Sequence, residues 1–227
     1  MKLKQSTLDA IKHLGEINRG LIIHEGKQLR TQDNLNKAIA YIDIEDEFPR
    51  TFGVYDVEEF LKSIKLVHDA ELTFEDTHVL ITNKEGIELV YQYADTDFVT
   101  EAPEKVNFPY VDPQSHDEDF INFSIDYDGI EQVIKACKTL GLGHIRFYSE
   151  SESETIYISA YDKSGSKKHT FKIPLDKFDS KRVVEAVFHL DRLTILAKGD
   201  YSVSIHTAGI SQFKSDTHTY YLATEAV

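Results

Sequence analysis

Two segments of the chain repeat one order of apolar and polar positions. In the segment that begins at Asp56, apolar residues fall at positions i, i+3, i+4 and i+7, the spacing of a helix with one buried face. The segment Asp126–Leu140 repeats that spacing after a shift of 73 residues. The two predicted buried faces consist of Val57, Phe60, Leu61 and Ile64 in the first copy and of Ile130, Val133, Ile134 and Cys137 in the second. A helix is therefore predicted over each copy.

Strand patterns follow both predicted helices in the same order. Short runs rich in β-branched and aromatic residues, bounded by polar residues and glycine, are typical of strands. These runs are "AELTF" (70–74), "HVLIT" (78–82) and "IELVYQY" (87–93) after the first helix, and "GHIRF" (143–147), "TIYISAY" (155–161) and "HTFKI" (169–173) after the second. The order predicts an internal duplication of a strand-helix-strand-strand-strand unit.

Two more units of the same kind complete the pattern. The N-terminus offers a third amphipathic helix, and a weaker fourth one around Asp191–Lys198 precedes the strand-like runs "YSVSIHT" and "THTYYLA". Between the halves, Thr96–Asp119 holds three of the five prolines and has no clear period, as in an extended connector. We therefore expect an α+β protein with two tandem domains, residues 1–100 and 120–227, joined by a connector over residues 101–119.

The first three helices also carry candidate start signals. The buried face of the N-terminal helix is predicted to consist of Thr7, Ala10, Ile11 and Leu14. A capping box pairs a small polar or acidic residue with an acidic or amide residue three positions later. The candidate boxes are Ser6 with Asp9, Asp56 with Glu59, and Asp128 with Glu131.

Lysines recur at equivalent positions on the outward faces of these helices. Lys12, Lys62 and Lys135 occupy the same place in the three patterns, and Thr194 stands there in the fourth. Lys65 and Lys138 lie on the flank of the buried face. Exposed lysines commonly serve solubility, but long cationic side chains on adjacent helices also suit phosphate contacts that read no base sequence.

Charge is distributed unevenly along the chain. The formal net charge is −14, which argues against adhesion to nucleic acid over the whole surface. The predicted helices (residues 1–19, 56–67, 128–140 and 189–198) nevertheless hold ten basic and eight acidic residues, against 15 basic and 31 acidic elsewhere. The sequence therefore predicts a basic helix surface on an acidic body, able to hold a DNA duplex loosely.

Other composition features narrow the class of protein. There is no apolar run of transmembrane length and no leader pattern, so we expect a cytosolic protein that does not enter a membrane. The single cysteine, Cys137, excludes an internal disulfide framework and a cysteine-based zinc site, and its place on an apolar helix face predicts a small buried side chain.

No motif in the chain points to catalysis, a metal or a cofactor. "GLGH" (141–144) follows a helix and reads as a glycine C-cap rather than a phosphate loop. "KSGSKKH" (163–169) reads as a hairpin tip whose basic side chains could contact DNA or a partner, and "SESESE" (149–154) as a polar turn. "HDED" (116–119) could bind a divalent cation, although a solvated run of charge in an acidic connector fits it better.

Four stretches of the chain stand out together: "MKL" with "IKHLGEINRG", "YDVEEFLKSIKLVHDAEL", "GDYSVSIHTAG" and "YYLATEA". In this order they resemble the sliding clamps of T-even-like bacteriophages, the rings that tether a replicative DNA polymerase to its template. Lys12, Lys62 and Lys65 lie inside these stretches, whereas Lys135 and Lys138 rest on the internal repeat. The resemblance extends over nearly the whole chain.

The resemblance implies a closed homotrimeric ring of clamp-type domains, with helices on one face of antiparallel sheets and lining the hole. It further implies double-stranded DNA, DNA polymerase and an ATP-dependent clamp loader as partners, a possible role with late transcription factors, and action in the cytoplasm of the infected bacterial host. Members also bind partner tails in an apolar pocket near the connector. The candidates for that pocket are Phe108, Tyr110, Val111, Tyr220, Tyr221 and Leu222, although a buried sheet edge would use the same residues.

Two other functions remain possible from the residues alone. An acidic scaffold or DNA mimic would use the negative surface to bind basic proteins. A small metal-dependent hydrolase would use Asp117 and Asp119 of the connector.

Overall fold

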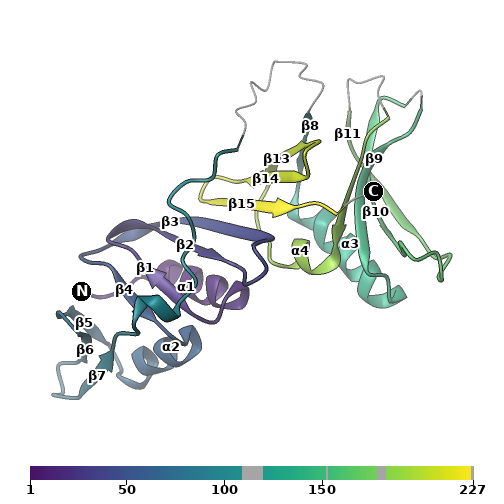
Figure 1. Cartoon of the computed structure of the whole chain (residues 1–227). Coiled ribbons are helices and arrows are strands. Elements are labelled where there is room, and N and C mark those ends of the chain that lie inside the picture. The colour runs from purple at the N-terminus through teal and green to yellow at the C-terminus, as the bar shows by residue number, and fades with distance from the viewer. Residues whose placement is uncertain (109–119, 152, 178–182, 226–227) are drawn as a thin grey trace. The chain divides into compact units, whose positions relative to one another are not determined.

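The chain divides into two compact units, Met1–Lys105 and Val106–Val227. Figure 1 labels their helices and strands along the chain. The structure is a computed structural model that describes residues 1–108, 120–151, 153–177 and 183–225. Residues 109–119 of the predicted connector therefore lie outside the described residues, and the predicted boundaries of the connector stay a prediction.

The first unit combines two helices with three groups of antiparallel strands. Its elements are α1 (Gln5–Ile17), β1 (Leu21–Ile23), β2 (Gly26–Gln32), β3 (Ala38–Phe48), β4 (Phe52–Val54), α2 (Val57–Leu66), β5 (Glu71–Phe74), β6 (His78–Thr82), β7 (Glu88–Gln92) and the short 3₁₀ helix η1 (Thr96–Phe98). Strand β1 pairs with β4, β2 pairs with β3, and β5, β6 and β7 form one sheet in that order. Helix α1 packs on β2 and β3, while α2 packs on β7 and on α1.

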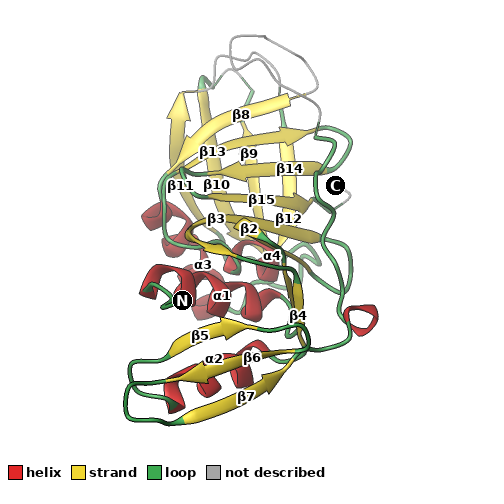
Figure 2. Cartoon of the chain, turned by 90° about the vertical axis from the view of Figure 1, so that its left-hand side faces the viewer, coloured by secondary structure: helices red, strands yellow, loops and turns green. Residues whose placement is uncertain are grey.

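The second unit contains two antiparallel sheets. Its elements are β8 (Phe120–Ile125), α3 (Tyr127–Leu140), β9 (His144–Ser149), β10 (Thr155–Tyr161), β11 (Phe171–Lys177), β12 (Glu185–His189), α4 (Leu190–Thr194), β13 (Tyr201–His206), β14 (Ile210–Lys214) and β15 (His218–Ala223). One sheet has the order β11-β10-β9-β12, and the other strands pair in the order β15-β14-β13-β8. Helix α3 covers one face of the first sheet, and α4 packs on α3 and β12 (Figure 2).

Each unit encloses a cluster of aromatic side chains. In the first unit Phe52 lies against four other rings, with centroid distances of 4.9 Å to Tyr93, 5.4 Å to Phe74, 6.0 Å to Phe48 and 6.2 Å to Phe60. The second unit has its own cluster, in which the rings of Phe123, Phe147, Phe188, Phe213, Tyr201 and Tyr220 pack together. Since aromatic side chains bury large apolar areas, each unit has a core of its own.

The element order confirms the predicted repetition. The chain reads as four successive groups: α1-β1-β2-β3, β4-α2-β5-β6-β7, β8-α3-β9-β10-β11 and β12-α4-β13-β14-β15. The predicted apolar faces of α1, α2 and α3 are all buried. Cys137 is fully buried as expected, and its pKa rises to about 11 because burial disfavours the thiolate.

The predicted helix starts were right for one helix and wrong for two. Asp56 caps α2, since its carboxylate accepts hydrogen bonds from the backbone N–H groups of Glu58 and Glu59. Helix α1 instead begins at Gln5 with no side-chain cap, so the box at Ser6 is wrong. Helix α3 begins earlier than expected, because Asp126 accepts a hydrogen bond from Gly129 N (2.7 Å) and leaves Asp128 inside the first turn.

The other local predictions can be compared with the structure around the helix ends. Gly141 ends α3 in the left-handed conformation (φ 63°), the region that glycine adopts without strain, which confirms the predicted C-cap. Residues 163–169 connect the antiparallel strands β10 and β11, as a hairpin tip should. Helix α4 has only five residues and ends at Thr194, earlier than the pattern around Asp191–Lys198 suggested.

Candidate nucleic-acid interface

The three candidate lysines of the first unit lie on the outward faces of α1 and α2. Lys12 directly follows the buried Ile11, and Lys62 directly follows the buried Leu61; both side chains are exposed. Lys65, in the last turn of α2, is exposed as well. Because α1 and α2 pack against each other, these ammonium groups belong to one helix layer within the unit.

The two lysines on α3 repeat this arrangement in the second unit. Lys135 is exposed, and so is Lys138, while the neighbouring residues Ile134 and Cys137 are buried. Lys138 occupies the last turn of the helix, where a cation complements the helix dipole. The structure therefore places all five candidate lysines on the outer faces of helices.

Lys62 and Lys135 each form an ion pair with a glutamate one turn earlier on the same helix. The Lys62 Nζ lies 2.6 Å from Glu58 Oε1, and the Lys135 Nζ lies 2.7 Å from Glu131 Oε2. The hydrogen bond and charge of Glu58 raise the pKa of Lys62. Solvent screens exposed pairs of this type, so a phosphate can replace the glutamate at little cost. Among the described residues, Lys12, Lys65 and Lys138 take part in no ion pair, which leaves their charges available.

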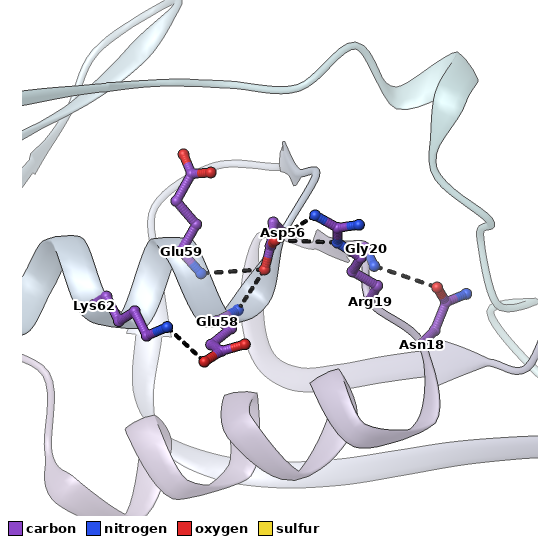
Figure 3. A network of polar contacts seen from close by, with 7 residues as sticks. All are labelled: Asn18, Arg19, Gly20, Asp56, Glu58, Glu59 and Lys62. Carbon is purple, nitrogen blue, oxygen red and sulfur yellow. Dashed lines mark hydrogen bonds and ion pairs between the residues drawn. The ribbon is translucent and has the colours of Figure 1, made fainter.

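Arg19 and Asp56 tie the end of α1 to the start of α2 (Figure 3). Asp56 Oδ1 accepts from Glu58 N (2.9 Å) and Glu59 N (3.1 Å), while Oδ2 accepts from Arg19 Nε (3.0 Å) and Nη2 (2.7 Å). The Arg19 hydrogen bond, followed by the backbone bond from Glu59, lowers the pKa of Asp56. Backbone Val57 N also donates to Arg19 O at 2.9 Å. This joint fixes the start of α2, and with it Lys62, against the end of α1.

Gly15 brings the two helices still closer together. A Cβ at this position would lie 2.6 Å from Val57 Cγ1, far inside contact distance. Only glycine therefore allows the present approach of α1 to the first residue of α2. Arg19 and Gly15 lie within the N-terminal stretch singled out in the sequence, but periodicity alone gave neither of them a role.

The fourth helix contributes little to the basic surface. Thr194 ends α4, and its hydroxyl donates to the backbone oxygen of Asp191 (2.9 Å). Lys198, in the loop that follows, is exposed and lowers the pKa of Glu131 after the larger effect of Lys135. Lys198 thus lies near the outward face of α3, a role that the sequence pattern missed because the residue falls outside a regular helix.

The candidate pocket residues do not share one surface. The rings of Phe108 and Tyr221 lie together, with centroids 5.6 Å apart. Tyr220 and Leu222 point to the other side of β15 and are 0% exposed in the core, where Tyr220 Oη accepts from Ala197 N (3.2 Å). Tyr110 and Val111 lie outside the described residues. The structure thus leaves Phe108 and Tyr221 as the pair that could contact a partner.

The candidate metal site of the connector can be compared with the structure only in part. The described residues contain no group of three or more His, Cys, Asp or Glu side chains that could hold a metal ion. The acidic run at 116–119, including Asp117 and Asp119, lies outside the described residues. No helix in the described part of the chain is long and apolar enough to cross a membrane.

Sequence comparisons find similar proteins in bacteriophages. A family model described as gp45 sliding clamp, C terminal, matches residues 122–226. A sliding clamp of Vibrio phage KVP40 is 45% identical over 227 residues, covering 100% of both chains. A sliding clamp of Escherichia phage RB69 is 24% identical and covers 100% of this chain and 97% of its own.

Solved structures with low sequence identity share the fold. The PCNA of A. fulgidus, solved with the C-terminal region of FEN-1, matches with a TM-score of 0.67 at 16% identity, over 97% of this chain and 95% of that one. An H. pylori β clamp matches with a TM-score of 0.63 at 14% identity over 98% of this chain. This chain spans 62% of the length of that β clamp.

None of these proteins is an acidic scaffold or DNA mimic, so that alternative has no support.

Proposed function

This chain belongs to the bacteriophage sliding clamp family and acts as a DNA polymerase processivity clamp, and we propose that three copies close a ring around duplex DNA. The observation that carries the proposal is the 45% identity to a phage sliding clamp over the full length of both chains. Each chain supplies two units whose helices expose the face turned away from the core of the unit. Three chains would therefore place six such units around the duplex. In this proposal the basic helix faces line the hole.

Lys12, Lys62, Lys65, Lys135 and Lys138 would contact the phosphates. Lysine contacts to phosphate carry no sequence information, so the ring could occupy any stretch of duplex. Three of the five ammonium groups are unpaired within the described chain, and the other two, which pair with glutamates, would exchange the glutamate for a phosphate. Such contacts would orient the ring and allow it to slide, while closure of the ring prevents its loss.

Open sheet edges provide a route to ring closure. In the first unit the outer side of β5 is occupied, because Leu72 exchanges two backbone hydrogen bonds of 2.7 Å with Met1. In the second unit the outer side of β12 is also occupied, because Val187 O accepts a hydrogen bond from Glu225 N (2.8 Å). Within the described residues, β7 and β11 thus remain as the open edges of these sheets. We propose that β7 of one protomer pairs with β11 of the next.

Features of the two strands fit this pairing. Ile87, just before β7, and Val90 within it are 45% and 48% exposed, apolar area that a partner strand would cover. Strand β11 contains Pro174, a residue that sheets tolerate mainly at their edges. A head-to-tail contact of this kind joins two different surfaces and can close into a ring.

We also propose the partners that the resemblance to the family implies. An ATP-dependent clamp loader would open one β7–β11 contact to admit DNA, in the cytoplasm of the infected bacterial host. The DNA polymerase, and late transcription factors where they are used, would dock tails near Phe108 and Tyr221. The proposal assigns the chain a tethering role without catalysis.

Retention on circular and linear DNA tests the function directly. The clamp, loaded with its cognate loader and ATP, should remain on nicked circular DNA and run off linear DNA of the same length, while sedimentation should detect a trimer at high protein concentration. Replacing Lys12, Lys62 and Lys135 by alanine should lower the salt slope of loading onto DNA by about 0.9 for each phosphate that is no longer neutralised. Equal loss from circular and linear DNA would refute the clamp, and an unchanged slope would refute the lining.

A further inference from the structure

The β10–β11 hairpin folds over the C-terminal end of α3. Its tip carries Lys163, Lys167, Lys168 and His169, all exposed. The Lys167 Nζ donates to the backbone oxygens of Leu140 (3.3 Å) and Gly141 (2.7 Å). These are carbonyls at the end of a helix, which have no partner within the helix and form the negative end of its dipole. Lys167 therefore converts a negative helix end into a cationic one.

The acidic residue at the base of this hairpin is engaged within the turn. The Asp162 carboxylate accepts hydrogen bonds from Lys167 N (2.9 Å) and from Ser164 N (3.1 Å) and Oγ (2.8 Å). The Lys167 bond is the main cause of a lowered pKa of Asp162, so this carboxylate stays ionised and occupied. From 163 to 170 the hairpin has three lysines and no acidic residue.

The first unit contains a natural comparison. There the β6–β7 hairpin occupies the same place after α2, because Asn83 Nδ2 donates to His68 O (3.1 Å) beyond the end of that helix. Its tip has one lysine, Lys84, and one glutamate, Glu85. The two hairpins thus share a position relative to their helices but differ in charge. Strand pairing does not require this difference, since both hairpins form antiparallel pairs.

We propose that the β10–β11 hairpin binds the phosphate backbone of duplex DNA at the end of the helix layer. The inference rests on the proposed function, in which the outward face of α3 already faces DNA. Lys138 in the last turn of α3 would begin a path of ammonium groups that Lys167 and Lys168 continue. Lys163 contributes less, because its Nζ lies 3.7 Å from Glu225 Oε2. Lys168 takes part in no ion pair among the described residues and is the main contact.

Site-specific crosslinking tests the location. The chain has a single cysteine, Cys137, which is buried, so a thiol-directed photocrosslinker will react with a cysteine introduced by Ser166→Cys or, as matched control, by Glu85→Cys. Both positions are exposed tips of hairpins. With clamp loaded on nicked circular DNA, we expect at least fivefold more protein–DNA crosslink from position 166 than from position 85. Equal yields would overturn the proposal, as would crosslinks from position 166 that go to the loader or polymerase instead of DNA.

A charge variant tests the energetics. Lys168→Ala should reduce the salt slope of loading onto DNA by about 0.9 for each phosphate that the three copies of this side chain in the ring neutralise, whereas Lys84→Ala should leave it unchanged. Sedimentation of both variants checks that they assemble like the wild type. If the wild type stays on circular DNA but Lys168→Ala has an unaltered slope, the hairpin inference fails and the clamp function stands. If the wild type does not distinguish circular from linear DNA, the clamp function itself fails.

Discussion

Substitution of Asp56 separates two interactions that one carboxylate makes. Its Oδ1 caps α2 through the N–H groups of Glu58 and Glu59, and its Oδ2 accepts both hydrogen bonds from Arg19. Alanine removes both interactions. Asparagine is as good an N-cap as aspartate, but once its oxygen caps the helix its amide group presents only N–H donors to the guanidinium. Asp56→Asn therefore keeps the cap and loses the ion pair.

The expected free energies of unfolding follow an order. Loss of an N-cap costs about 1 kcal/mol, within a range of about 0.5–2. Asp56→Ala should therefore destabilise by at least about 1 kcal/mol, since it removes the cap together with the ion pair to Arg19. Asp56→Asn should lie between the wild type and alanine. Arg19→Met, which keeps the cap and removes the pair, should resemble Asp56→Asn.

The ion pair also predicts a pH dependence with a defined sign. Because the pKa of Asp56 is lowered in the folded state, its charge stabilises the fold above the unfolded pKa, near pH 4. That stability is lost as the pH falls through the lower folded pKa. The difference between wild type and Asp56→Asn should be full at pH 7 and shrink toward pH 3.

Urea unfolding at pH 7, 5, 4 and 3, at one ionic strength and one protein concentration, measures these differences. The fixed concentration matters because assembly adds to apparent stability. Equal stability of the asparagine and alanine variants would show that the cap contributes nothing. A wild-type advantage over asparagine that persists undiminished at pH 3 would refute the role given to the Arg19 pair.

Two further changes test other parts of the architecture. Gly15→Ala should lower the free energy of unfolding by about 1–3 kcal/mol through overpacking against Val57, less a gain of about 1 kcal/mol in helix propensity. Adding Val57→Ala to this variant should restore part of the stability measured by urea unfolding. Val90→Pro should weaken trimer formation in sedimentation while sparing the monomer fold. The backbone N–H of Tyr93 and the backbone oxygen of Ile87 form hydrogen bonds on the β6 side of β7. Because backbone groups of successive residues point to alternate sides of a strand, the N–H of Val90 points toward the open edge. Unaltered assembly of Val90→Pro would exclude β7 as the joining strand.

The sequence predicted the helices better than it predicted their ends. The faces of α1, α2 and α3 followed directly from a period of about 3.6, because burial on one side of a helix dictates that spacing. The start of α3 did not follow, since Asp126 and Asp128 both suit a cap; in the structure β8 ends at Ile125 and the next residue, Asp126, is the cap. Short strands such as β1 and β4, three residues each, carry too little alternation to be distinguished from loops.

The same limit applied to the candidate site. Equivalent positions in the repeat identified Lys12, Lys62 and Lys135, because a repeated fold exposes repeated positions. Lys198 interacts with Glu131, which lies 67 residues away in sequence, and no local pattern predicts such a contact. The apolar character of Tyr220 and Leu222 suits a pocket, yet strand alternation sends both into the core and leaves Tyr221 outside.

The glutamates beside two of the lysines bear on how such a surface could hold DNA. Glu58 and Glu131 precede Lys62 and Lys135 by one turn, so each helix face carries a negative charge toward its start and a positive charge toward its end. A phosphate would gain a lysine only by displacing a glutamate, which keeps each contact weak and easily exchanged. A uniformly basic lining would bind more tightly and impede movement along the duplex. Since closure of a ring already prevents dissociation, weak contacts suit the proposed clamp better than strong ones.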